Sequence, residues 1–323
     1  MIKGLHLIPE ETKIPFIAAR LYAFALSAVL IVGSIALMAA QGLNFGIDFR
    51  GGIMLEIQTD GPADLAALRD EVSALGLGDA TLQEFGEPDQ VLIRVPLQPG
   101  GTAEQTAAID ALRTVLDPYV TDYRRTEFVG PQVGQELIRA GLLAVGLSLA
   151  GIMAYIWLRF EWQFGVAALI ALAHDVCATL GLFALTQMEF NLSTVAAALM
   201  IAGYSINDTV VVFDRVREKL RKFKSYELPD IFNLAINATL SRTIITSGTT
   251  LLALGALWFF GGEVIRGFVI ALIWGVVIGT YSSIFIAAPL LLIFGVQRGS
   301  GEKEPSETDK MRERAEVISP SPS

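Results

Sequence analysis

The sequence predicts a polytopic α-helical membrane protein with six transmembrane helices and one small α+β domain. Of the 323 residues, 53% are hydrophobic and 18% are charged, whereas about a quarter of an ordinary soluble domain is charged. Six apolar runs each approach the ~20 residues that a helix needs to cross the hydrocarbon core. The polar segment 41–136, between the first two runs, is long enough to fold around a core of its own.

The apolar runs place the transmembrane helices at 18–40, 137–158, 164–186, 192–213, 243–261 and 268–294. The first run is too long for the apolar part of a signal peptide, and no cleavage site precedes Gln41, so it is expected to be an anchor. Short turns make the second, third and fourth helices antiparallel neighbours. Gly275 and Gly279 predict a close helix contact in the sixth, either within the chain or with a second subunit.

Basic residues predict the orientation, because they stay on the cytoplasmic side. With the termini inside, all seven lysines fall in the cytoplasm. The segment 41–136 then lies outside and carries sixteen acidic residues against six arginines, which disfavours nucleic acid and anionic lipid head groups as its partners. The single cysteine, Cys177, can form no internal disulfide. These features indicate a bacterial inner membrane protein with a periplasmic domain at 41–136.

The pattern of the periplasmic segment predicts a ferredoxin-like fold. Its elements follow the order β-α-β-β-α-β. The expected ranges are strand 53–57, helix 63–75, strands 80–85 and 91–95, helix 102–116 with Thr102 as N-cap, and strand 119–128. This fold hosts many functions and assigns none by itself.

Three further segments lie on the cytoplasmic side. The arm 1–17 precedes the first helix, and the polar tail 295–323 is rich in Pro and Ser and is expected to be disordered. After the basic segment 215–224, the amphipathic stretch 229–240 is expected to lie along the membrane interface.

No motif of a soluble enzyme is found, so we expect a protein that is not an enzyme. The sequence contains no nucleotide-binding loop and no cluster of metal ligands, and no cofactor is expected. His6 lies in the cytoplasmic arm and His174 inside a span, so they cannot share a site. These observations disfavour a nucleotide-driven pump and a membrane protease.

Ionisable residues inside the spans are the candidate site. Asp208 lies well inside the fourth helix, where a charge costs at least ~2.5–3.5 kcal/mol and usually faces a partner or a wet path. Ser205 shares its face at i−3, and Asn207 is a further polar neighbour. Arg242 enters the fifth helix as the natural counter-charge of Asp208. The face of Arg242 continues through two hydroxyl residues, Thr246 and Thr249.

Structural alternatives stay open for each of these groups. Asp208 could be a static interhelical hydrogen-bonding group, and Arg242 could be an interfacial anchor that reaches the head groups. Asp214 begins the basic run and is either a solvated salt-bridge partner or part of the relay. Asp175, beside His174, is either structural or a second relay group.

Four segments, in order, resemble the SecF branch of the SecD/SecF family of protein-export membrane proteins, in the RND superfamily. They are FGIDFRGG at 45–52, VGPQVG at 129–134, GYSINDT at 203–209 with DRVRE at 214–218, and SRTIITSGTT at 241–250. The resemblance covers about 15–295. Ser241 stands where some members are expected to have His.

The resemblance implies a proton-motive-force-driven factor that helps unfolded secreted polypeptides leave the SecYEG channel on the periplasmic side. Its obligate partner would be SecD, with YajC and YidC as further associates, and the coupling ion would be H⁺ or Na⁺. The family's relay residues map onto Asp208 and Arg242. The signature outside the first span maps onto Asp48, Arg50, Gly51 and Gly52, which we take as a structural coupling of domain and membrane.

Transporters of the RND type use two six-span repeats, and this chain supplies one. Two other functions stay open at this point. The chain could be half of an RND-type proton-coupled exporter of small molecules or lipids, although such exporters generally carry much larger periplasmic loops. It could also be a translocon scaffold without a proton step.

Overall fold

The computed structural model describes residues 12–296, and these contain six helices long and apolar enough to cross a membrane. The predicted fold class is confirmed. The expectations for 1–11 and for the tail from 297 onward lie outside the described residues. The long helices are α1 (Arg20–Gln41, after the short η1, Phe16–Ala19), α5 (Pro131–Arg159), α6 (Trp162–Thr186), α7 (Leu192–Lys222), α8 (Leu228–Phe260) and α9 (Arg266–Ser282).

The last span continues beyond α9 without a break. It passes through one π-helical segment, η3 (Ser283–Ala287), into α10 (Ala288–Ile293). Proline has no N–H to donate to the carbonyl four residues earlier, and Pro289 lies just after η3. The wider π-turn is the local adjustment to this proline.

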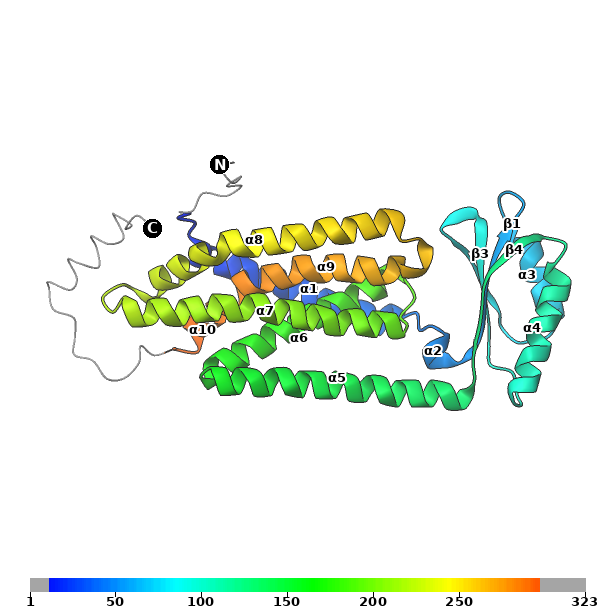
Figure 1. The fold of residues 1–323 in the computed structure, drawn as a ribbon, viewed down its shortest axis with the longest axis horizontal. Coiled ribbons are helices and arrows are strands. Elements are labelled where there is room, and N and C mark those ends of the chain that lie inside the picture. The colour runs from blue at the N-terminus through cyan, green and yellow to red at the C-terminus, as the bar shows by residue number, and fades with distance from the viewer. Residues whose placement is uncertain (1–11, 297–323) are drawn as a thin grey trace, which may run out of the picture.

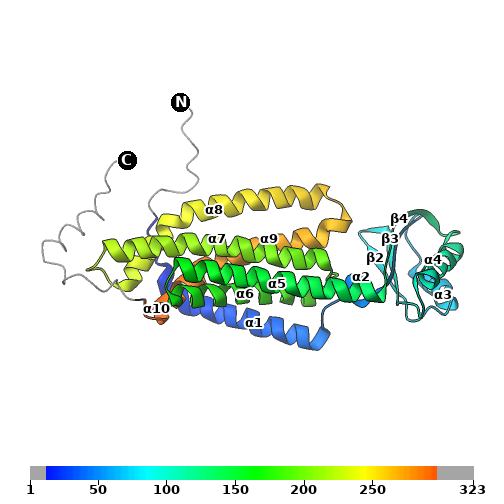
Figure 2. The ribbon, with the colours of Figure 1, turned by 60° about the horizontal axis from the view of Figure 1, so that its bottom comes forward.

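The helices form an elongated bundle with the α+β domain at one end (Figures 1 and 2). Three helices, α6, α7 and α9, have the largest buried share of their apolar stretches, and α1, α5 and α8 have the smallest. The first three are therefore central, and the others surround them. Leucines such as Leu143, Leu147 and Leu252 point away from the chain's own core.

The α+β domain has one antiparallel sheet with the strand order β2-β3-β1-β4, which is the ferredoxin-like arrangement. Its elements are β1 (Gly52–Thr59), α3 (Leu65–Ala74), β2 (Thr81–Phe85), β3 (Glu87–Val95), α4 (Thr102–Leu116) and β4 (Val120–Val129). In both views α3 and α4 cover the face of the sheet that is turned away from the bundle. The other face is turned toward the membrane helices.

This layering explains why β1 is an almost continuous apolar run. Side chains alternate between the two faces of a strand. On the helix side, Leu55 and Ile57 pack against Leu68 and Leu112. On the membrane side, Met54 packs in a second cluster that includes the short helix α2 (Ile47–Arg50). Both faces of β1 are therefore covered.

The two helix starts of the domain differ in their capping. Helix α4 begins at Thr102 itself, so Thr102 is not the N-cap as predicted; Gly101 is. Gly101 has the extended backbone of an N-cap residue, and its N–H donates to the Glu104 carboxylate (2.7 Å). Helix α3 is capped by Asp64, which accepts hydrogen bonds from two backbone N–H groups of the first turn.

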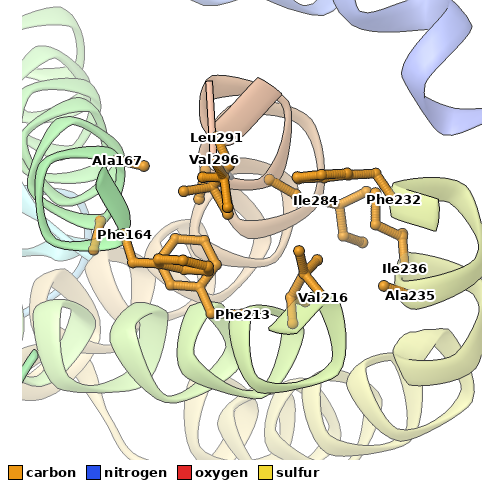
Figure 3. Close-up of a cluster of buried hydrophobic side chains, with 14 of the residues drawn as sticks. Phe164, Ala167, Phe213, Val216, Phe232, Ala235, Ile236, Ile284, Leu291 and Val296 are labelled. Atoms are coloured by element: carbon orange, nitrogen blue, oxygen red, sulfur yellow. The ribbon is translucent and has the colours of Figure 1, made fainter. Parts of the chain in front are cut away.

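The stretch 229–240 does not lie separately along the interface, contrary to the prediction. It forms the first turns of α8. Its apolar face packs in the main core of the bundle, where Phe232 and Ile236 lie close to Val216 and Ile284 (Figure 3). An amphipathic face buries itself wherever an apolar surface is available, and here the end of the bundle offers one.

The small residues of the sixth span bring α9 against α7 within the chain. A Cβ on Gly275 would overlap the side chain of Ile201, and a Cβ on Gly279 would lie 3.0 Å from that of Ser205. Of the two alternatives left open by the sequence, packing within the chain is therefore the one observed. The glycines let the two helix backbones approach closely.

We predict that Gly275→Ala destabilises the bundle, because the added methyl group must displace Ile201. Overpacking of this kind costs about 1–3 kcal/mol. The thermal unfolding midpoint of the purified chain in detergent should fall. Gly248→Ala is the matched control, since a Cβ there meets nothing within 4 Å, and an equal loss in both variants would contradict the close α7–α9 contact.

Candidate functional site

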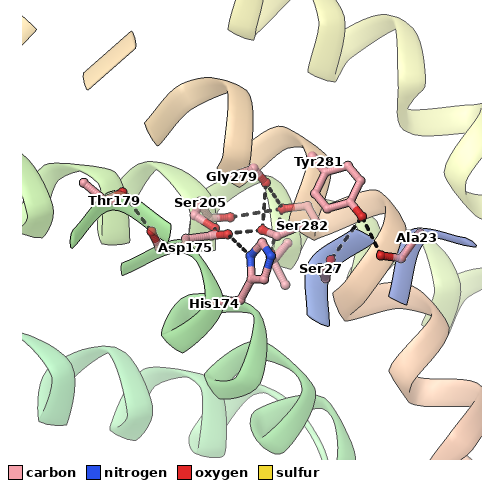
Figure 4. Close-up of polar contacts among 11 residues, drawn as sticks. Ala23, Ser27, His174, Asp175, Thr179, Ser205, Gly279, Tyr281 and Ser282 are labelled. Carbon is pink, nitrogen blue, oxygen red and sulfur yellow. Dashed lines mark hydrogen bonds and ion pairs between the residues drawn. The ribbon is translucent and has the colours of Figure 1, made fainter. Parts of the chain in front are cut away.

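Buried polar side chains gather where the three central helices meet (Figure 4). His174 and Asp175 come from α6, Ser205 from α7 and Ser282 from α9, and all four are buried. The hydrocarbon core supplies no water to satisfy such groups, so they must satisfy each other.

Asp175 is the centre of this cluster. Its Oδ2 accepts hydrogen bonds from the Ser205 hydroxyl (2.5 Å) and the Ser282 hydroxyl (2.7 Å). Its Oδ1 lies 3.0 Å from Nδ1 of His174. One carboxylate thus joins α6, α7 and α9. The sequence placed Ser205 beside Asp208, but its hydroxyl binds Asp175 instead.

A second buried contact is made by the next residue, Ser283, the first residue of η3. The hydroxyls of Ser283 and Thr209 are 2.8 Å apart, and Ser283 also donates to the Gly279 carbonyl (2.9 Å). Ser283 begins the π-helical segment. The wider turn therefore adjoins the two serines that hold α9 to α6 and α7.

Asp208 is buried on the side of α7 that faces α8. Its Oδ1 accepts a hydrogen bond from Thr243 (3.3 Å). Its Oδ2 is buried and has no hydrogen-bond partner among residues 12–296. Buried polar atoms are nearly always paired, so an exception asks for an explanation.

Arg242 does not form the direct ion pair with Asp208 that the sequence suggested. The residue is exposed, and no ion pair joins the two within the described chain. The reason is helical geometry: successive residues point about 100° apart, and Thr243 is the residue that faces α7. Thr246 and Thr249 donate to backbone carbonyls of their own helix.

The hydroxyl groups that do contact the neighbouring helices were missed from the sequence. Thr243 reaches Asp208, and Ser247, four residues on, contacts Tyr204 (3.3 Å) and Thr280 (2.7 Å). The available signal was the i, i+4 spacing of Thr243 and Ser247. Arg242 and Thr246 have the same i, i+4 spacing, so spacing alone could not show which of the two pairs faces α7.

Within residues 12–296, two other predicted residues, Asp214 and Asn207, make no hydrogen bond to Asp175 or Asp208. Asp214 forms an ion pair with Arg159 (2.7 Å), and both side chains are nearly half exposed. This pair ties the end of α5 to α7, as in the salt-bridge alternative for Asp214. Asn207 is exposed on the outer face of α7.

The signature residues after the first span join the α+β domain to the bundle. Asp48 accepts a hydrogen bond from the backbone N–H of Leu192, the first residue of α7 (2.9 Å). A carboxylate is stabilised there by the helix dipole and satisfies a free N–H group. Phe49 stacks on Phe190 beside this contact.

A second contact lies between the sheet and the loop that connects α6 and α7. Arg94 of β3 forms an ion pair with Glu189 (2.6 Å), and the two side chains are 14% and 20% exposed. Arg94 also donates to Asn44, whose amide in turn donates to the Gln187 carbonyl. We call Asn44, Asp48, Arg94 and Glu189 the junction.

The two glycines of the signature are required by the backbone. Gly51 and Gly52 have φ values of 71° and 115°, which favour glycine. A Cβ on Gly52 would lie 2.5 Å from the Val95 carbonyl oxygen. Arg50 is exposed. The glycines thus bend the chain from α2 directly into β1.

We predict that reversing either charge of the Arg94–Glu189 pair loosens the junction. Arg94→Glu and Glu189→Arg each remove a charged hydrogen bond worth about 1.5–3 kcal/mol. Amide hydrogen exchange at the start of α7 should become faster in each single variant. The double variant restores opposite charges and should recover most of the protection.

Arg125→Glu is the matched control for this cycle. Arg125 pairs with Glu127 at 2.7 Å, but both side chains are at least a third exposed, and such pairs contribute little. If the double variant exchanges as fast as the single ones, the ion pair does not hold the domain in place.

Known proteins of one family are similar to this chain along almost its whole length. Residues 110–297 match the family described as protein export membrane protein SecD/SecF, C-terminal, and residues 36–63 match the SecD/SecF GG motif. The protein translocase subunit SecF of Cereibacter sphaeroides is 48% identical over 309 residues, which cover 93% of this chain and 95% of the relative. That of Rickettsia bellii is 46% identical over 298 residues, covering 91% and 97%.

Two solved structures are similar in fold. The crystal structure of SecDF, a translocon-associated membrane protein from Thermus thermophilus, has a TM-score of 0.80 at 33% identity and covers 89% of this chain. SecDF in a super-membrane-facing form has a TM-score of 0.65 at 32% identity and covers 95%. This chain spans only 39% and 40% of those two chains. From the family match over more than half of its length and from these relatives, the chain belongs to the SecD/SecF family of protein export membrane proteins.

Proposed function

We propose that the chain acts as the SecF subunit of a SecDF complex, which uses the proton-motive force to assist protein translocation across the bacterial inner membrane. Both named relatives are SecF subunits of protein translocases. The SecDF chains are more than twice as long as this one. SecD is the partner that would supply the other six-span repeat.

The orientation rests on the basic residues. Both termini would lie in the cytoplasm, because this places every lysine of the chain there. The α+β domain then lies in the periplasm, where a secreted polypeptide emerges. A half-exporter of small molecules or lipids is set aside, since the named relatives are protein translocase subunits.

The observation that carries the proton step is the free Oδ2 atom of Asp208. The atom is buried, and no hydrogen-bond donor among residues 12–296 reaches it. An ionised carboxylate in this position is costly, and binding a proton at the free oxygen removes the charge. Asp208 is therefore placed to alternate between a charged and a neutral form.

The two forms would favour different positions of α8. The charged form would attract the guanidinium of Arg242, which comes directly before Thr243 in α8. The neutral form keeps the hydrogen bond that Thr243 donates to Oδ1 of Asp208 in this structure. One charge that crosses 100 mV releases about 2.3 kcal/mol, enough to shift such an equilibrium roughly fifty-fold.

The surroundings of Asp208 favour H⁺ over a metal cation as the coupling ion. Asp208 offers one free oxygen, with the Thr243 hydroxyl beside its other oxygen. Hard cations such as Ca²⁺ take six or more oxygen ligands, whereas a proton needs one acceptor.

The junction would transmit this movement to the periplasm. Asp48 holds the first residue of α7, and Arg94 holds the loop before it. The α+β domain would then change its position when α7 moves, close to the unfolded polypeptide leaving SecYEG. YajC and YidC are proposed as further associates, and the chain itself would catalyse no covalent reaction.

We predict that Asp208→Asn abolishes the response of secretion to the proton gradient. Asparagine has nearly the same shape but cannot bind and release a proton. The measurement is the export of a reporter preprotein by vesicles that contain the variant with SecD, with and without a gradient. The ratio of the two rates should fall to that of vesicles lacking the chain.

Asp230→Asn is the matched control, because Asp230 is exposed in the first turn of α8, about three turns before Thr243 and the Asp208 site. It should keep the wild-type ratio. A full gradient response in Asp208→Asn would leave the scaffold alternative, in which the chain assists translocation without a proton step.

A further inference from the structure

His174 and Asp175 form a buried pair that the Asp208 step does not use. We propose that His174 is a second proton-carrying group of this chain, with Nε2 as the atom that takes up the proton and Asp175 as its fixed counter-charge. The proposal rests on the proposed function, because the proton gradient would supply the proton.

The first step of the argument is the state of Asp175. Two hydroxyl groups donate to its Oδ2, from Ser205 at 2.5 Å and from Ser282 at 2.7 Å. Both donors reach the same oxygen, and an ionised carboxylate is an acceptor only. In the proposed state Asp175 is ionised, so the hydrogen between Oδ1 and His174 is on Nδ1, which lies 3.0 Å away.

The second step concerns the other ring nitrogen. When Nδ1 carries the hydrogen of a neutral imidazole, Nε2 has a free lone pair. This Nε2 atom is buried, and no residue of the described chain hydrogen-bonds to it. His174 is only 6% exposed as a whole. The basic nitrogen of the ring, in the middle of α6, therefore has no hydrogen-bond partner among the described residues.

Among residues 12–296, the surroundings of the pair supply no other counter-ion. From α9, the ring of Tyr281 lies 6.2 Å from the imidazole, but its hydroxyl is bonded to Ser27 and to the Ala23 carbonyl of α1. From α7, Ser205 is uncharged, and the charged group next to it is Asp208, one turn further. The other titratable group on this part of α6 is the Cys177 thiol.

The proton step is simple to balance. The Nε2 lone pair binds H⁺, the ring becomes an imidazolium, and Nδ1–H stays on Asp175. The pair then changes from one negative charge to none, which reduces the cost of a charge in the hydrocarbon core. Release of the proton from Nε2 reverses the change.

Ser205 would connect this event with Asp208. Both residues are buried on one face of α7, three positions apart. Ser205 is bonded to Asp175 on one side and packed against Gly279 on the other. A weaker pull of Asp175 on Ser205, after His174 has taken a proton, would let α7 shift and carry Asp208 with it.

Nitrogen NMR on the complex tests the assignment directly, because the chain has only two histidines, His6 and His174. The complex is prepared with ¹⁵N-labelled histidine, and the His174→Gln complex identifies the signals of His174 by difference. As the pH is lowered from alkaline to acidic, we expect the signals of a neutral ring with hydrogen on Nδ1 and a bare Nε2 to be replaced by those of an imidazolium.

Asp175→Asn should lose the imidazolium signal over this range, and Cys177→Ala should keep it. A ring with hydrogen on Nε2 and a bare Nδ1 would overturn the assignment, because Asp175 would then be the donor. A ring that stays neutral throughout the range would also overturn it and leave His174 a structural residue.

Export measurements separate this proposal from the Asp208 step. Glutamine at 174 can still donate to Asp175 but cannot bind a proton at neutral pH, so His174→Gln should weaken the dependence of the gradient response on external pH while Asp208 remains intact. If Asp208→Asn leaves the response unchanged while His174 titrates, the proposed function fails and the proton site stands. An unchanged pH dependence in His174→Gln would remove the role of His174 in transport.

Discussion

The carboxylate of Asp175 determines how the three central helices meet. It lies where no water can satisfy it, so its hydrogen bonds must come from the neighbouring helices, and Ser205 and Ser282 supply them. These contacts require α7 and α9 to lie very close together. Gly275 and Gly279 make that approach possible, because neither carries a side chain into the contact. The hydrogen bonds of the polar cluster therefore depend on the close packing of α7 and α9 at the bundle centre.

Helix α7 connects every part of the molecule to which a function can be given. Its first residue is held by Asp48 of the glycine-containing signature, and Asp214, beyond its middle, pairs with the end of α5. Ser205 and Asp208 lie between them. Both buried carboxylates therefore act on a helix whose end is attached to the α+β domain. A change in charge in the membrane and a change in the domain's position share one rigid element.

The fold could be predicted because its signals are local. A span shows itself as an apolar run, and the domain shows itself through alternation and spacing in elements such as 53–57 and 102–116. Local patterns did not predict the position of an element that could pack either at the membrane interface or in the bundle core. The stretch 229–240 has the pattern of an interfacial helix, yet it packs on Phe213 and Val216 of α7 within the bundle core. Its amphipathic pattern shows which face is buried but leaves open what covers it.

The sequence by itself determined that Asp175 and Asp208 lie inside the membrane, since hydropathy and the cost of a charge are properties of a single segment. It did not determine their partners. Adjacent residues such as Arg242 and Thr243 point in different directions, and only the rotation of α8 against α7 decided that the hydroxyl, and not the guanidinium, contacts Asp208. The same holds for Ser205, which the sequence placed beside Asp208 but whose hydroxyl donates to Asp175. Contacts between helices depend on how whole helices pack, and that is a property of the tertiary structure alone.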